Sequence, residues 1–80
     1  MMYTIDTVIH KLAIALAAYD LQYRLYNQGL PNELLSARSQ AMIISEEFKR
    51  MSKGMSKEEV EAALSEMERQ KAIQKGIETN

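Results

Sequence analysis

The residues of this chain that could do chemistry are few, and the single histidine comes first among them. His10 follows Asp6 by four residues, so a helix would place the imidazole one turn from the carboxylate. A carboxylate beside a histidine is the start of a catalytic pair, which also needs a nucleophile next to the imidazole. No serine or cysteine stands at a spacing that would supply one. We therefore expect Asp6 and His10 to form an exposed ion pair without a catalytic role.

Metal and phosphate chemistry have equally little support in the sequence. Metal sites in helical bundles use Glu-x-x-His pairs, and the chain contains none. Cysteine is absent, which excludes disulfides and thiolate zinc sites. The glycines stand apart at positions 29, 54 and 76, so they form no phosphate-binding loop. The glutamate pairs at 46–47 and 58–59 lie among lysines, as solvated helix faces do. We expect no enzyme, no metal and no cofactor.

The elements that carry these residues are predicted to be helices, because two apolar repeats alternate spacings of four and three. Residues at that spacing share one stripe of an α-helix and form the seam between packed helices. The first repeat comprises Ile5, Ile9, Leu12, Leu16, Tyr19, Tyr23 and Tyr26. The second comprises Leu30, Leu34, Ala37, Ala41, Ile44, Phe48, Met51 and Met55.

Residues suited to helix ends place the first two helices. Thr4 or Asp6 can cap the first helix through a side-chain oxygen, and Gly29 can adopt the left-handed backbone that ends it. Pro31 suits the first turn of the second helix, where its missing N–H costs nothing. The first two helices should therefore cover about residues 4–28 and 31–53.

A third helix is predicted over about residues 56–75, because Ser56 and Glu59 match the capping box, in which each side chain bonds the backbone N–H of the other. Short loops favour antiparallel neighbours. We therefore expect an all-α fold, a three-helix unit built on a long antiparallel hairpin with the third helix packed across or beside it. It should form one domain over residues 1–75, followed by a disordered tail over 76–80.

The length and charge of the chain favour association with another protein. A folded chain of 80 residues buries only about 60% of the surface that it exposes when unfolded. Small domains add disulfides, metals or partner subunits, and here a partner subunit or idealised helix packing remains. A net charge of −1 gives no field toward nucleic acid or anionic membranes. The longest apolar stretch, residues 12–18, is far shorter than the ~20 residues of a membrane span, and no basic segment marks a signal peptide. We expect a cytoplasmic protein.

The first predicted helix is apolar on two opposite sides. Ile14 follows Leu12 by two residues, which turns it about 200° around the helix axis. It begins a second apolar line, which comprises Ile14, Ala18, Leu21 and Leu25. A helix that is apolar nearly all round is expected to be buried. Either the other two helices cover both sides within a monomer, or the second line meets a second copy or a different protein. We favour the latter, with a homodimer whose hairpins form a four-helix core.

Tyrosines extend the candidate interface. Tyr19, Tyr23 and Tyr26 combine an apolar body with a polar tip, as residues at binding hot spots do. They could instead cover the turn between the first two helices, against Leu30 and Leu34. The second helix also carries apolar residues off its main stripe, namely Leu35, Met42 and Ile43. The sequence thus predicts a non-catalytic helical protein–protein interaction module, a small regulator or inhibitor that docks on a partner through Ile14, Ala18, Leu21, Leu25, Tyr19, Tyr23 and Tyr26.

Two alternatives remain. The basic cluster of Lys49, Arg50, Lys53 and Lys57 around the second turn suggests a small helical regulator that associates with nucleic acid, although glutamates on both sides dilute its charge. The chain could also serve as a structural subunit of a larger assembly.

Overall fold

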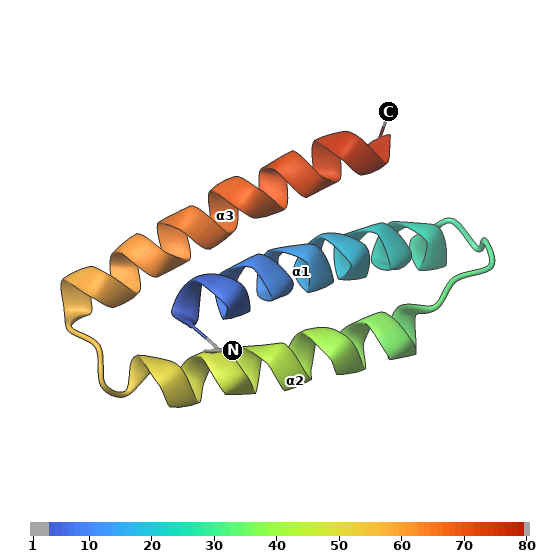
Figure 1. Cartoon of the computed structure of the whole chain (residues 1–80). Coiled ribbons are helices and arrows are strands. Elements are labelled where there is room, and N and C mark those ends of the chain that lie inside the picture. The colour runs from blue at the N-terminus through green and yellow to red at the C-terminus, as the bar shows by residue number, and fades with distance from the viewer. Residues whose placement is uncertain (1–3, 80) are drawn as a thin grey trace.

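The chain folds into three helices, with the first helix between the other two. The computed structural model describes residues 4–79, with side chains described to residue 76. Its helices are α1 (Ile5–Asn27), α2 (Leu34–Ser52) and α3 (Lys57–Thr79). α2 runs antiparallel to α1, and α3 returns in the direction of α1 on its other side (Figure 1). The all-α fold and its antiparallel hairpin are therefore confirmed.

Both predicted ends of α1 are confirmed. The Thr4 side chain caps the helix, because its Oγ1 accepts a hydrogen bond from the Thr7 N–H at 3.4 Å. At the other end Gly29 has a φ of +72°, in the left-handed region. The Leu30 N–H donates to the Leu25 carbonyl at 3.0 Å, and the Gly29 N–H donates to the Tyr26 carbonyl at 3.1 Å. These two bonds form a Schellman motif, which satisfies carbonyls that the helix itself leaves unpaired.

The start of α2 corrects the sequence prediction. The helix begins at Leu34, and Pro31 lies in the loop before it instead of in its first turn. Asn32 explains the difference, because its Oδ1 accepts the Leu34 N–H and its Nδ2 donates to the Leu30 carbonyl, both at 3.0 Å. Such local side-chain bonds offer the backbone an alternative to the helix. The Glu33 N–H is taken by the Gln22 side chain of α1 at 2.6 Å, which ties the loop to the preceding helix.

The capping box at the start of α3 is confirmed. The Ser56 N–H donates to Glu59 Oε1 at 2.9 Å, and the Glu59 N–H donates to Ser56 Oγ at 3.1 Å. The Ser56 bonds also lower the pKa of the Glu59 carboxyl. α3 continues past its predicted end to Thr79, so residues 76–79 extend the helix where a disordered tail was expected. Residue 80 lies outside the described part of the chain.

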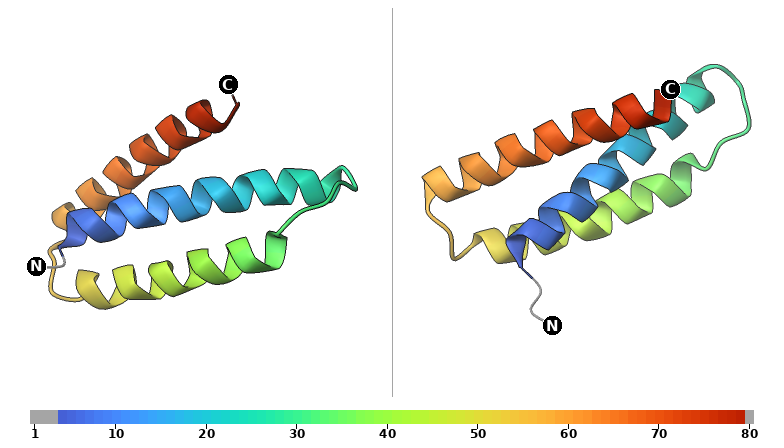
Figure 2. Two further views of the ribbon diagram at one scale, coloured as in Figure 1. Left: turned by 45° about the vertical axis from the view of Figure 1, so that its right-hand side comes forward. Right: turned by 45° about the horizontal axis from the view of Figure 1, so that its top comes forward.

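The core lies where the first half of α1 meets the second half of α2 and the first half of α3. Its buried members are Val8, Ile9, Leu12, Ala13, Phe48, Ala63 and Met67. α2 and α3 each pack along α1 and hardly touch each other, so α1 supplies most of this core (Figures 1 and 2). Val8 is fully buried although it belongs to neither apolar line of the sequence.

The far end of the three-helix unit is more open and is held by polar contacts. Tyr23 and Tyr26 belong to the first apolar repeat, yet they are 48% and 58% exposed. There α3 is tied to α1 by Asp20, whose Oδ2 lies 2.9 Å from Lys75 Nζ and 3.7 Å from Lys71 Nζ. None of the helices in residues 4–79 combines the length and apolar character that crossing a membrane requires.

Two glycines form a matched pair that tests the end of α1. Gly29→Ala should lower the free energy of unfolding by about 1–2 kcal/mol, because an L-residue would have to hold the left-handed backbone. Gly54 has no positive φ and open space around it, so Gly54→Ala should be neutral or stabilising by up to about 1 kcal/mol. Urea unfolding followed by circular dichroism measures both. An equal loss in the two variants would contradict the cap.

Candidate protein-interaction surface

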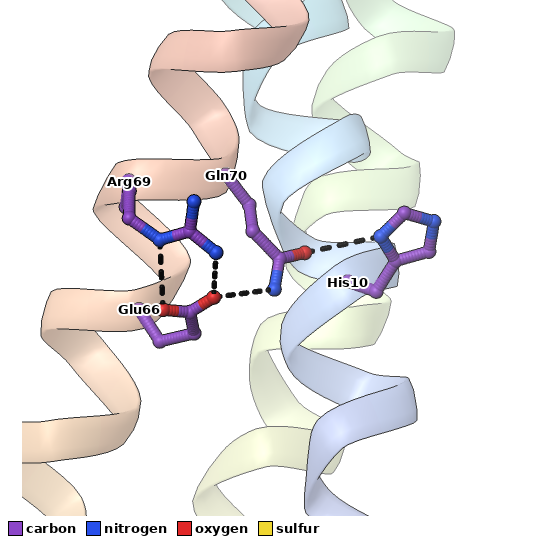
Figure 3. Close-up of polar contacts among 4 residues, drawn as sticks. All are labelled: His10, Glu66, Arg69 and Gln70. Carbon is purple, nitrogen blue, oxygen red and sulfur yellow. Dashed lines mark hydrogen bonds and ion pairs between the residues drawn. The ribbon is translucent and has the colours of Figure 1, made fainter.

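The single histidine takes part in a contact between helices. His10 Nδ1 lies 3.0 Å from Gln70 Oε1 of α3, and Gln70 Nε2 donates to Glu66 Oε1 at 3.1 Å (Figure 3). Arg69 completes the network through Nε, 3.0 Å from Glu66 Oε2, and through Nη2. The expected ion pair with Asp6 is not among the ion pairs described for residues 4–79. The imidazole therefore links α1 to α3 at an exposed site.

The other polar side chains that the sequence singled out are acidic and basic residues on the helix surfaces. Among the described residues, no three histidine, aspartate or glutamate side chains come together as metal ligands would. Of the basic residues proposed for nucleic acid, Lys49 Nζ lies 3.4 Å from Glu46 Oε1. Arg50, Lys53 and Lys57 are exposed around the turn between α2 and α3, beside the acidic first turn of α3.

The seven residues proposed as an interface lie on two sides of the α1–α2 pair. Ile14 and Ala18 line one surface hollow between these helices, and Tyr19 lines another. The hollows open on opposite sides of the line along which α1 contacts α2, since Ile14 and Leu16 differ by about 200° around the axis. The proposed residues therefore form two separate surfaces.

The first hollow is apolar and is built from small residues. It has a volume of about 320 Å³ and is lined by Lys11, Ile14, Ala15, Ala18, Ala37, Gln40 and Ile44, which we call the alanine hollow. Leu21 follows Ala18 by three residues and Leu25 follows Leu21 by four, so both continue its α1 side, and both are half-buried. On α2, Ile43 stands one turn after Gln40 and is 62% exposed. The alanine hollow together with Leu21, Leu25 and Ile43 is called the alanine face.

The second hollow is more polar at its rim. It also has a volume of about 320 Å³ and is lined by Leu16, Tyr19, Arg38, Ala41, Met42 and Ser45, which we call the tyrosine hollow. The Tyr19 ring packs on Tyr23, with centroids 6.1 Å apart and planes inclined by 54°. Tyr26 is exposed near the end of α1. Tyr19 and Tyr23 thus support each other beside this hollow, and Arg38 places a charge at its edge.

The sequence showed the apolar residues of α2 that lie off its main stripe, but the predicted interface did not include them. Met42 and Ile43 are 56% and 62% exposed and point about 100° apart around α2, and Met42 lines the tyrosine hollow. The available signal was their position off the apolar stripe of α2. Comparisons with known protein families, with curated proteins and with solved structures give no significant match to this chain. The geometry of these two surfaces therefore carries the functional argument.

The network around Glu66 predicts a dependence of stability on pH. The hydrogen bonds from Arg69, and then from Gln70, lower the pKa of Glu66 from 4.5 to about 2. The ionised carboxylate therefore stabilises the folded state above pH 4.5, and this contribution is lost as the pH falls through about 2.

As the pH falls from 4.5 to about 2, the free energy of unfolding should decrease more steeply for the wild-type chain than for Glu66→Gln. Glu61→Gln, on an exposed part of the same helix, serves as the control and should keep the wild-type slope. Urea midpoints at a series of pH values measure the effect. Identical slopes for the wild type and Glu66→Gln would contradict it.

Proposed function

We propose that this chain is a non-catalytic helical protein–protein interaction module, a small regulator that docks on a protein through the alanine face. The observation that supports this function most strongly is the exposure of Ile14. This residue belongs to α1, the helix that packs against both α2 and α3, yet Ile14 keeps 41% of its surface accessible to solvent. The packing of α2 and α3 leaves this side of α1 uncovered.

The make-up of the alanine face suits a protein partner. Protein interfaces have an apolar centre with few charges and a polar rim. Here alanines, isoleucines and leucines form the centre, and Lys11 and Gln40 lie at the edge of the hollow. The small side chains of Ala15, Ala18 and Ala37 allow an approaching helix to come close to both α1 and α2. A helix that filled this hollow would bury apolar surface, and each Å² of buried apolar surface contributes about 25 cal/mol of favourable free energy.

The wider setting belongs to the same proposal. We place the protein in the cytoplasm, because a chain without cysteine suits a reducing compartment. A role as a structural subunit would use the same face in a permanent complex. The nucleic-acid alternative has less support, because Lys49 already pairs with Glu46 and the first turn of α3 is acidic. Negative charge there repels phosphate groups.

Co-purification from the native host tests the docking function. A tagged wild-type chain should retain one protein in a stoichiometric amount, either its own untagged copy or another protein. Ile14→Glu should lose that protein, because it places a charge in the centre of the face, and the exposure of Ile14 lets the variant fold.

Leu35→Glu is the matched control for that experiment. It makes the same change at a residue that is 79% exposed and lines neither hollow, so it should retain the partner. Circular dichroism should show equal helicity in the three proteins. A partner retained by Ile14→Glu, or no partner on any of them, would count against the proposed function.

A further inference from the structure

We propose that the occupant of the alanine face is a second copy of this chain, packed antiparallel about a two-fold axis between Ala18 and Leu21 of α1. This inference rests on the proposed function and names its partner. Two hairpins would then form a four-helix core, with α3 of each copy outside it. The accessible surface of the whole chain, together with the residue pattern and the charge of the face, supports this arrangement.

The chain exposes more surface than a compact monomer of its size. Its accessible surface is 5717 Å², whereas a folded monomer of 9.1 kDa exposes about 4,900 Å². The difference, about 800 Å², is the area that one partner contributes to a standard interface. The radius of gyration of 13.7 Å likewise exceeds the ~11.6 Å of a compact domain of 80 residues. These totals describe the whole chain, and a surplus of this size is large enough to accommodate one symmetric partner.

The pattern of the α1 line is complementary to itself in the antiparallel direction. Its residues are large, small, large and large, at positions 14, 18, 21 and 25. An axis between Ala18 and Leu21 places the small Ala18 opposite Leu21 of the partner subunit, and Ile14 opposite Leu25 of the partner subunit. Leu21 and Leu25 of each copy then reach the alanine hollow of the other, as knobs enter holes in packed helices. A parallel pairing would set Ala18 against Ala18 and leave a gap there.

Each hollow has one basic residue in its lining, Lys11 or Arg38, and the proposed axis keeps the Lys11 side chains of the two copies apart because it lies about 13 Å along α1 from Lys11. Lys11 is the one charged residue among those that define the alanine face, and it lies at the edge. A two-fold axis through the tyrosine hollow would instead bring the Arg38 side chains of both copies together. Like charges in an interface cost binding free energy. A net charge of −1 adds little repulsion between whole molecules.

Sedimentation equilibrium on the purified chain tests this assignment through two neighbouring residues. Ile43 and Met42 are both exposed apolar residues of α2, so a glutamate at either position is compatible with folding. The wild type should sediment at twice 9.1 kDa. Ile43→Glu should weaken the dimer by at least about tenfold, because Ile43 belongs to the alanine face. Met42→Glu should leave the dissociation constant unchanged, because Met42 lines the tyrosine hollow.

The outcomes separate this inference from the function on which it rests. A wild-type chain that stays monomeric at about 100 μM, or a dimer broken by Met42→Glu and kept by Ile43→Glu, overturns the inference. If the chain is monomeric while host co-purification still depends on Ile14, the partner is a different protein and the proposed function stands. If both experiments fail, neither proposal survives.

The absence of cysteine allows the direction of packing to be tested separately. Ile14 and Leu25 are about 16 Å apart along α1, so a short bismaleimide reagent distinguishes the two directions. A mixture of Ile14→Cys and Leu25→Cys chains should cross-link to a dimer, and each variant alone should not. Efficient cross-linking of Ile14→Cys alone would indicate parallel packing and would overturn the two-fold axis proposed here.

Discussion

The structure depends on the burial of α1 between two helices that barely contact each other. Val8 of α1 is fully buried in the core, and Phe48 of α2 and Met67 of α3 belong to the same core cluster. α1 therefore acts as the shared wall of two helix pairs. Two neighbouring helices can each bury one side of α1. Because α1 is apolar on nearly all sides, part of its apolar surface stays uncovered. The uncovered sector is the one that begins at Ile14.

Polar contacts hold the first loop and the second half of α3 in place against α1. Gln22 bonds the Glu33 N–H and so holds the first loop against α1, while Asp20 holds the second half of α3 through Lys75. These bonds are exposed or half-buried, and surface ion pairs contribute little free energy each. Their role is to orient the open end, where apolar packing is sparse. The chain thus has a well-packed end held by its core and an open end held by hydrogen bonds and ion pairs.

The sequence predicted the parts of this fold that depend on local interactions. Thr4, Gly29 and the Ser56–Glu59 box act on residues within one turn, so their spacing alone predicts the helix ends they produce. Asn32 escaped prediction because its two bonds compete with a favourable proline signal one residue earlier. Val8 escaped because its burial depends on how α2 crosses α1, which periodicity does not give. The hydrogen-bond partners of His10 and Asp20 could not be predicted either, because they lie 60 and 55 residues away along the chain.

The candidate site shows the same division. The apolar line from Ile14 is visible in the sequence, but the hollow beside it exists only because α2 places Ala37 and Ile44 next to Ala15 and Ala18. Helix packing therefore converts a line of residues into a surface with depth. Because a chain of this size has a small core, a partner that binds only the folded state would also stabilise it, by an amount that rises with partner concentration. A partner that covered the exposed side of α1 would therefore raise the free energy of unfolding of the chain through the same contacts by which it binds.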